Sequence, residues 1–190
     1  MTDKLKKHEV IGCCGIDCGL CPVFHSKGNS ACPGCGGVGF KEKHPSCSFI
    51  TCCVIKKSLE VCSDCLEYPC KRFDSEKNGY DSFVTHKKVF SNLDYIKNIG
   101  ISPFIDQQRI RIDILTNLLQ NFDDGRSKSF FCISCALLPI DKLQNIHRFM
   151  KSLSLNTDLK ERNKQIRDLL LTTADILNIK LILDKKKDGF

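Results

Sequence analysis

The sequence predicts a mainly α-helical protein that begins with an irregular, metal-stapled, cysteine-rich module and contains little β-structure. Twelve of its fourteen cysteines lie between Cys13 and Cys70, a density well above the level of roughly 8–10% that marks a cysteine scaffold. The same stretch is punctuated by Gly and Pro and has almost no helical periodicity. Beyond it, hydrophobic side chains recur at helical spacing.

Composition divides the chain into a metal-binding module at residues 8–75 and a helical part at residues 76–190. A module this poor in aliphatic residues cannot bury much core of its own, so bound metal has to replace that core. One short helix is expected near residues 51–59. No clear linker separates the two parts, so they can share one core.

The helical part is predicted element by element. Residues 81–98 place Phe83 and several aliphatic side chains on one broad face, and Gly100 is typical of a helix end. Ser102 and Pro103 suit the N-cap and first position of a helix that continues to residue 122. Further elements follow: a loop at 123–129, a buried helix or strand at 130–138, amphipathic helices at 140–153 and 157–178 with Asn156 or Thr157 as the second cap, and a β-like stretch at 179–184.

Charge and hydropathy exclude several classes of protein. No apolar run approaches the roughly 18 residues that span a bilayer, and the charged N-terminus lacks the apolar segment of a secretory signal. We therefore expect a cytoplasmic protein without a membrane partner, whose reduced thiols bind metal or carry redox chemistry. The formal charge of +7 counts thiols as neutral. Metal-bound thiolates make the module neutral to acidic. The sequence therefore allows nucleic acid as a partner but gives no support for it.

The cysteine spacing predicts metal ligands. A C-x-x-C turn aims two sulfurs at one ion, and three such units in one module are a strong signal. Ten cysteines are spaced for this role: Cys14, Cys18, Cys21, Cys32, Cys35, Cys47, Cys52, Cys62, Cys65 and Cys70. Because zinc takes four thiolates, ten suffice for about two ions. Cys13 and Cys53 each adjoin another cysteine, and they fit small buried hydrophobes as well as ligands.

An iron–sulfur cluster is the alternative cofactor, because thiolate spacing alone does not choose the metal. Cys14-x3-Cys18-x2-Cys21 has the spacing of radical S-adenosylmethionine enzymes, but the chain lacks the repeated strand–helix units on which those enzymes build their site. The bacterial ferredoxin run is also absent. Zinc is therefore expected, and the pairing of cysteines into sites stays open.

Several motifs resemble a known family. CCGIDCGLCPVF, CPGCGG, CSFITC and VCSDCLEYPC are similar to a cysteine-rich family of unknown function found largely in anaerobic bacteria and archaea. GRSKSFFC and LLPIDKL resemble a more C-terminal part often attached to it, so the likeness covers most of residues 10–141. The resemblance implies zinc binding through the same ten cysteines and no assigned activity. It gives no support to Cys13, Cys53 or Cys135.

Two further motifs lie in the helical part. Arg126 and Lys128, in a Gly- and Ser-containing loop ahead of a helix start, are candidates to bind a phosphate or carboxylate. A solvated loop with a serine N-cap is the favoured alternative. Cys132 and Cys135 form a fourth C-x-x-C in the apolar context FFCISCALL, where core packing is favoured over a redox dithiol.

The expected function is metal binding by a cysteine-rich binding or adaptor module whose partner is an unknown protein or other macromolecule. No Ser/His/Asp order, P-loop or H-E-x-x-H motif is present, so no catalytic residue is predicted and enzymatic activity is not favoured. Two alternatives stay open: an iron–sulfur redox or electron-transfer protein, and an enzyme whose metal keeps an open ligand position.

Overall fold

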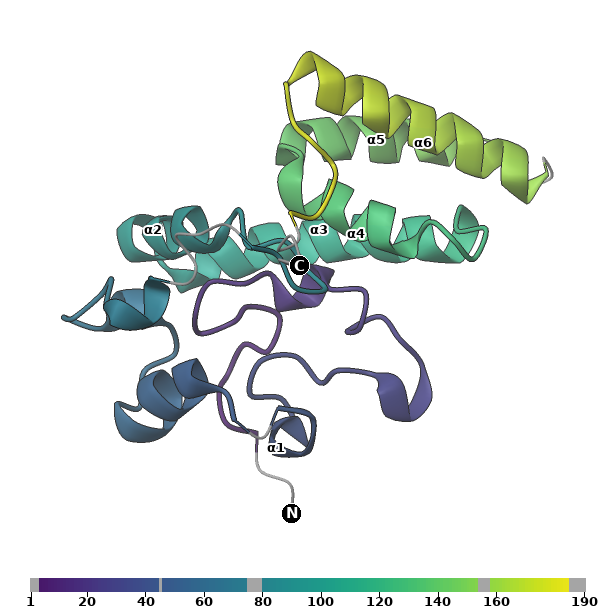
Figure 1. The fold of residues 1–190 in the computed structure, drawn as a ribbon. Helices are drawn as coiled ribbons and strands as arrows, with labels where there is room; N and C mark the ends of the chain where they lie inside the picture. The colour runs from purple at the N-terminus through teal and green to yellow at the C-terminus, as the bar shows by residue number, and fades with distance from the viewer. Residues whose placement is uncertain (1–3, 45, 75–79, 154–157, 185–190) are drawn as a thin grey trace, which may run out of the picture. The chain divides into compact units, whose positions relative to one another are not determined.

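The structure is a computed structural model that describes residues 4–44, 46–74, 80–153 and 158–184. These residues form helices, turns and irregular loops, and they contain no β-strand (Figure 1). The predicted mainly α fold with a cysteine-rich N-terminal module is confirmed. The chain divides into two compact units, Met1–Gln108 with Leu183–Phe190, and Arg109–Ile182. The predicted boundary at residue 75 adjoins a stretch outside the described residues and stays a prediction.

The cysteine-rich module is built from short turns rather than long elements. A one-turn helix, α1, spans Phe40–Lys43, and a π-helix spans Ile50–Lys56, close to the short helix expected at 51–59. The 3-10 helices of the module span Cys18–Leu20, Gly28–Ser30, Cys62–Asp64 and Lys71–Phe73. None of these elements is long enough to bury a stable apolar face alone.

Helix α2 (Val89–Ile99) supplies part of the core on which the module folds. The core cluster of this unit joins side chains from the module with side chains from α2 and the beginning of α3: Ile11, Cys14, Val61, Phe73, Val89, Leu93, Ile96, Phe104 and Ile105. Gly15 allows the close approach, because a Cβ at its φ of +94° would lie 2.5 Å from the carbonyl oxygen of Val89.

The expected helix at 81–98 begins later than the periodicity predicts. Asp81 bonds the backbone instead: its Oδ1 accepts the N–H of His86 at 2.6 Å. Such a local side-chain bond holds a turn in place of the first helical turns. Phe83 is accordingly 73% exposed rather than part of the buried face. The predicted end at Gly100 is correct, with a φ of +107°.

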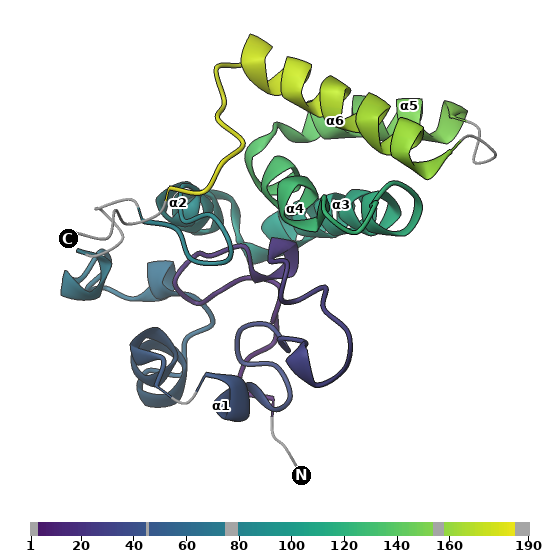
Figure 2. The same cartoon turned by 45° about the vertical axis from the view of Figure 1, so that its right-hand side comes forward.

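The second unit consists of helices. Helix α3 (Ile101–Asn121) runs into it from the first unit, and α4 (Lys128–Leu137), α5 (Ile140–Ser152) and α6 (Leu159–Ile176) follow. Helices α5 and α6 lie side by side in both views (Figures 1 and 2). All but the last of residues 130–138 are therefore helical, and α3 begins slightly before the Ser102–Pro103 start that we expected.

Of two expectations near the C-terminal end, one differs from the structure and the other falls outside the described residues. The β-like stretch 179–184 is not a strand. Its last residue, Asp184, accepts the N–H of Asp81 at its carbonyl oxygen at 2.7 Å and donates its own N–H to the Asp81 carboxylate at 2.8 Å. Alternation alone makes no strand without a partner strand. Asp158 caps α6 through the N–H groups of Lys160 and Glu161, while the expected caps Asn156 and Thr157 lie outside the described residues.

Candidate metal centre

Two of the C-x-x-C units form the tight turns that metal knuckles require. In the first, the N–H of Cys21 donates to the carbonyl oxygen of Cys18 at 3.1 Å, and in the second the N–H of Cys65 donates to that of Cys62 at 3.0 Å. Both turns are 3-10 helical. None of the fourteen cysteines, all of which lie in the described part of the chain, forms a disulfide.

Three thiols converge in what we call the inner group, Cys13, Cys53 and Cys62. Their sulfur atoms all lie within 4.8 Å of one another. In a tetrahedral zinc site with Zn–S bonds of about 2.3 Å, sulfurs lie about 3.8 Å apart, so small shifts bring these three onto one ion. A fourth thiol adjoins them, because the N–H of Cys13 donates to Sγ of Cys35 at 3.4 Å.

Hydrogen bonds among these thiols favour loss of protons from two of them. A bond from Cys13 is the main cause that lowers the pKa of Cys53 to about 4 and that of Cys35 to about 7. The pKa of Cys13 itself is raised, first by its bonds to Cys35, Cys53 and Cys62 and then by burial. Since the thiolate is the metal ligand, the group is prepared for binding.

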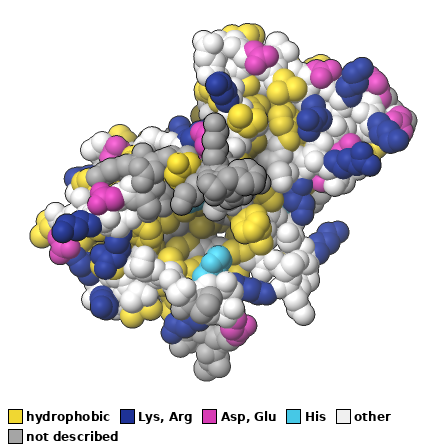
Figure 3. All heavy atoms as spheres, viewed as in Figure 1, with side chains coloured by type: hydrophobic (Ala, Val, Ile, Leu, Met, Phe, Trp, Pro, Cys, Tyr) yellow, Lys and Arg dark blue, Asp and Glu magenta, His cyan; other side chains and the backbone are white. Residues whose placement is uncertain are grey.

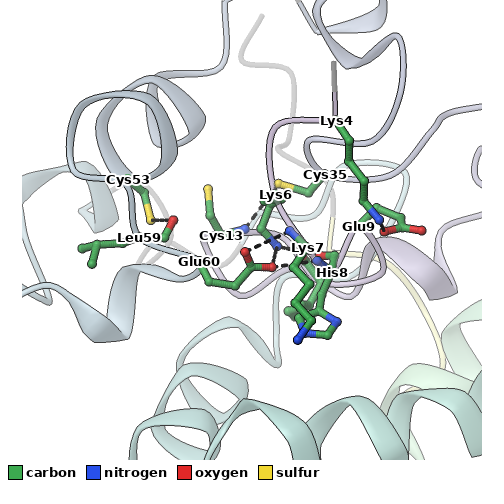
Figure 4. Close-up of polar contacts among 11 residues, drawn as sticks. Lys4, Lys6, Lys7, His8, Glu9, Cys13, Cys35, Cys53, Leu59 and Glu60 are labelled. Atoms are coloured by element: carbon green, nitrogen blue, oxygen red, sulfur yellow. Dashed lines mark hydrogen bonds and ion pairs between the residues drawn. The ribbon is translucent and has the colours of Figure 1, made fainter. Parts of the chain in front are cut away.

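A buried lysine lies beside the inner group (Figure 4). The side chain of Lys6 is fully buried, and its ammonium donates to the carbonyl oxygens of His8 and Ile11 at 2.6 and 2.9 Å. It also lies 3.3 Å from Glu60 Oε1. Burial raises the pKa of Glu60, but Lys6 and two backbone N–H groups outweigh it and lower that pKa. Lys6 also lowers the pKa of Cys53 after the larger effects above.

A second set of thiols, the knuckle group, surrounds Cys18. Burial and then four neighbouring thiols raise the pKa of Cys18. The members of the group are Cys14, Cys18, Cys21, Cys32 and Cys35. The sulfur of Cys21 accepts backbone N–H groups from Val23 and Phe24, which act against the burial that raises its pKa. Backbone N–H groups directed at a cysteine sulfur are the arrangement expected of a metal knuckle.

A third set, the pocket group, consists of Cys52, Cys62, Cys65 and Cys70. These four, together with Cys53 of the inner group, line one pocket whose space, open solvent included, is about 350 Å³. Lys57 and Arg72 lie at the same pocket. The ammonium of Lys57 donates to Sγ of Cys65 at 3.1 Å and pairs with Glu67 at 2.7 Å.

Among the described residues, the inner group is where three sulfurs lie within 4.8 Å of one another, and Cys62 is the one predicted ligand in it. The knuckle and pocket groups contain nine of the ten cysteines. Cys47 lies in neither group and packs against the cluster around Phe40 and Ile50. Cys32 also has Nε2 of His44 at 3.4 Å from its sulfur. The ligand set itself stays a prediction, because metal identity and count are not fixed by these contacts.

Sequence spacing missed Cys13 and Cys53, although each belongs to the tightest thiol group. Each is half of a Cys-Cys doublet, and the two halves serve different groups. Cys13 joins the inner group and Cys14 lies near Cys18, while Cys53 joins the inner group and lines the pocket together with Cys52. Adjacent side chains point apart, so the doublets themselves were the available signal for neighbouring sites.

The candidate anion loop is occupied by its own carboxylates. Asp123 accepts the N–H groups of Gly125 and Ser127 at 3.0 Å, and Asp124 accepts the N–H of Arg126 at 3.1 Å. These bonds use the backbone N–H groups that would otherwise be available to an external anion. Anion binding by Arg126 and Lys128 stays a prediction. Cys132 and Cys135 are buried in α4, as core packing requires.

No protein-family model, curated protein or solved structure matches this chain. The resemblance of its cysteine motifs to a family therefore stays an expectation. Among the described helices, none is both long enough and apolar enough to cross a membrane.

Proposed function

We propose that this protein binds structural zinc, about two ions, through its cysteine-rich module and serves as a binding or adaptor module. One observation carries the proposal: the sulfurs of Cys13, Cys53 and Cys62 converge within 4.8 Å, and no disulfide joins them. Converging thiols can act as ligands to one ion, and four-thiolate sites are typical of structural zinc.

A structural role is supported by the number of thiols at each place. Each group offers four sulfurs when Cys35 is counted with the inner group and Cys62 is counted in both the inner and the pocket group. A closed four-thiolate shell leaves no position for water or substrate, which is the difference between structural and catalytic zinc. The module also lacks long elements, so the energy of metal binding contributes directly to its folding.

A protein or other macromolecule in the cytoplasm is the proposed partner. On the face shown in Figure 3, Lys and Arg side chains are interspersed with Asp and Glu over α5 and α6. A nucleic-acid grip requires a basic patch or stripe of one sign. This mixed surface favours a protein partner over nucleic acid.

Metal analysis with an absorbance spectrum, on protein purified without oxygen, tests the proposal. We expect about two zinc ions per chain and no band at about 400 nm. Iron with sulfide and a broad visible band would replace zinc with a cluster, and would make the protein a redox or electron-transfer protein. A chain that folds and binds neither metal would refute the proposal.

A further inference from the structure

Cys62 belongs to two thiol groups at once. Its sulfur lies within 4.8 Å of those of Cys13 and Cys53, and it also lines the pocket with Cys52, Cys53, Cys65 and Cys70. Cys53 lies at both places too, but Cys62 differs from it in having its C-x-x-C partner at the pocket. Cys62 begins the 3-10 turn Cys62–Asp64, and its N–H donates to the carbonyl oxygen of Cys13 at 2.7 Å. This backbone bond holds the shared cysteine at the inner group while its C-x-x-C partner, Cys65, stays at the pocket.

The pocket has the donors of a metal site in its own right. Five cysteines line it, Cys53 of the inner group among them, and four thiolates suffice for a tetrahedral shell.

We propose that the inner and pocket groups form a two-ion centre in which the Cys62 thiolate bridges both metals. Cys13, Cys35 and Cys53 complete one shell, and Cys52, Cys65 and Cys70 complete the other. Each thiol gives up its proton to solvent on binding, and nothing is oxidised or reduced. The knuckle group keeps Cys14, Cys18, Cys21 and Cys32 for a separate ion. This inference rests on the proposed function and raises its count from about two ions to about three.

Neighbouring cations offset part of the charge that such a centre would carry. Seven thiolates and two divalent ions leave a net charge of about −3. Lys57 contacts Sγ of Cys65, Arg72 lines the pocket, and Lys6 is buried beside the inner group. Glu67 and Glu60 pair with the two lysines and reduce this offset. Three cations near these sulfurs favour metal-bound thiolates over neutral thiols without metal.

Cobalt(II) titration of the full-length, metal-depleted chain tests the bridge without any substitution. Two cobalt ions that share a thiolate couple magnetically and lose most of their electron paramagnetic resonance signal. We expect the signal to rise and then fall during the titration, and to end near that of about one isolated ion out of about three bound. A signal that grows in proportion to bound cobalt up to saturation overturns the bridge and leaves metal binding intact. A chain that binds neither cobalt nor zinc refutes both.

Three Cys→Ser variants place the shared ligand. Cys65→Ser should lose about one ion and restore the signal of the ion left behind, whereas Cys62→Ser should lose about two. Cys18→Ser is the matched control: it removes a ligand of the knuckle group and should leave the coupled pair in place. Equal losses in Cys62→Ser and Cys65→Ser, with the coupled pair retained, contradict the bridge.

Discussion

At the scale of single residues, the most unusual side chain is Lys6. Its ammonium is removed from solvent and is satisfied by two carbonyl oxygens and one carboxylate. An ammonium in such a position is retained only where its partners are fixed, because breaking a buried pair leaves an unpaired charge. Lys6 thus ties the start of the chain to Glu60, just before the second knuckle.

Replacing Lys6 should destabilise the module although the residue lies outside every cysteine motif. Lys6→Met keeps most of the side-chain volume and leaves the carbonyls of His8 and Ile11 without their donor. We expect a loss of about 2 kcal/mol in the free energy of unfolding of the metal-loaded protein, measured by urea denaturation. Lys7→Met, at an exposed position, is the control and should stay within about 0.5 kcal/mol. Equal stability of the two variants would contradict this role.

At the scale of elements, the first knuckle depends on close contact with α2. Gly15 is where the chain approaches the helix, and Asn92 of α2 donates to the carbonyl oxygen of Gly15 at 2.9 Å and to Asp17 at 3.0 Å. Asp17 is 2% exposed and also accepts from Gln108 of α3 at 3.0 Å. Asp17 lies between Cys14 and Cys18 in the sequence, so the bonds from these two amides to its buried carboxylate hold the first knuckle in position.

Two glycine variants separate this contact from backbone strain. Gly15 and Gly28 both have positive φ, of 94° and 65°, but a Cβ meets the backbone of Val89 only at Gly15 and meets nothing at Gly28. Gly28→Ala should cost about 1 kcal/mol, for the left-handed conformation alone. Gly15→Ala should cost about 3 kcal/mol or more, because the backbone of α2 has to move. Thermal unfolding of both metal-loaded variants measures the difference, and similar losses would show that the contact is unimportant.

Helix α4 carries a thiol, that of Cys135, whose pKa is set by burial rather than by the thiol groups of the module. Burial raises the pKa of Cys135 from 9.0 to about 12. A raised thiol pKa contributes stability that is complete below pH 9 and is lost as pH rises toward 12, since the unfolded chain loses the proton first. The stability gap between wild type and Cys135→Ala should therefore narrow over this range, by at most about 1.4 kcal/mol per pH unit. Urea denaturation of both proteins from pH 8 upward measures it, and a constant gap would show an accessible thiol.

At the scale of the whole molecule, local features were predictable and distant ones were not. The knuckle turns at Cys18–Cys21 and Cys62–Cys65 follow from C-x-x-C spacing, because the turn is closed within four residues. The inner group joins Cys13 to Cys53 and Cys62, and only the fold brings those segments together. The late start of α2 has a different origin: a local bond of the Asp81 carboxylate to the N–H of His86 overrides an apolar pattern that would otherwise continue the helix.

Metal removal should unfold one part of the chain and spare another. In the proposed function, metal cross-links residues 10–72, whereas α5 and α6 bury Leu143, Ile146, Ile166 and Leu170 in the unit that contains none of the proposed ligands. After chelation we expect hydrogen exchange, followed by mass spectrometry, to become fast in peptides from residues 10–72 and to stay slow in α5 and α6. Added zinc should restore protection. Protection that persists throughout the module without metal would mean that it folds on its apolar contacts.

The wide sequence separation within the inner group has a consequence for biosynthesis. Cys13 leaves the ribosome long before Cys53 and Cys62. It is therefore exposed to solution before its final neighbours have been synthesised. During that interval the early thiols can pair with each other or with small oxidants, by ordinary thiol–disulfide exchange. A chain of this design needs reducing surroundings until its last knuckle has been translated. We expect correct metal loading to follow the completion of residue 70 rather than to accompany the emergence of the first knuckle.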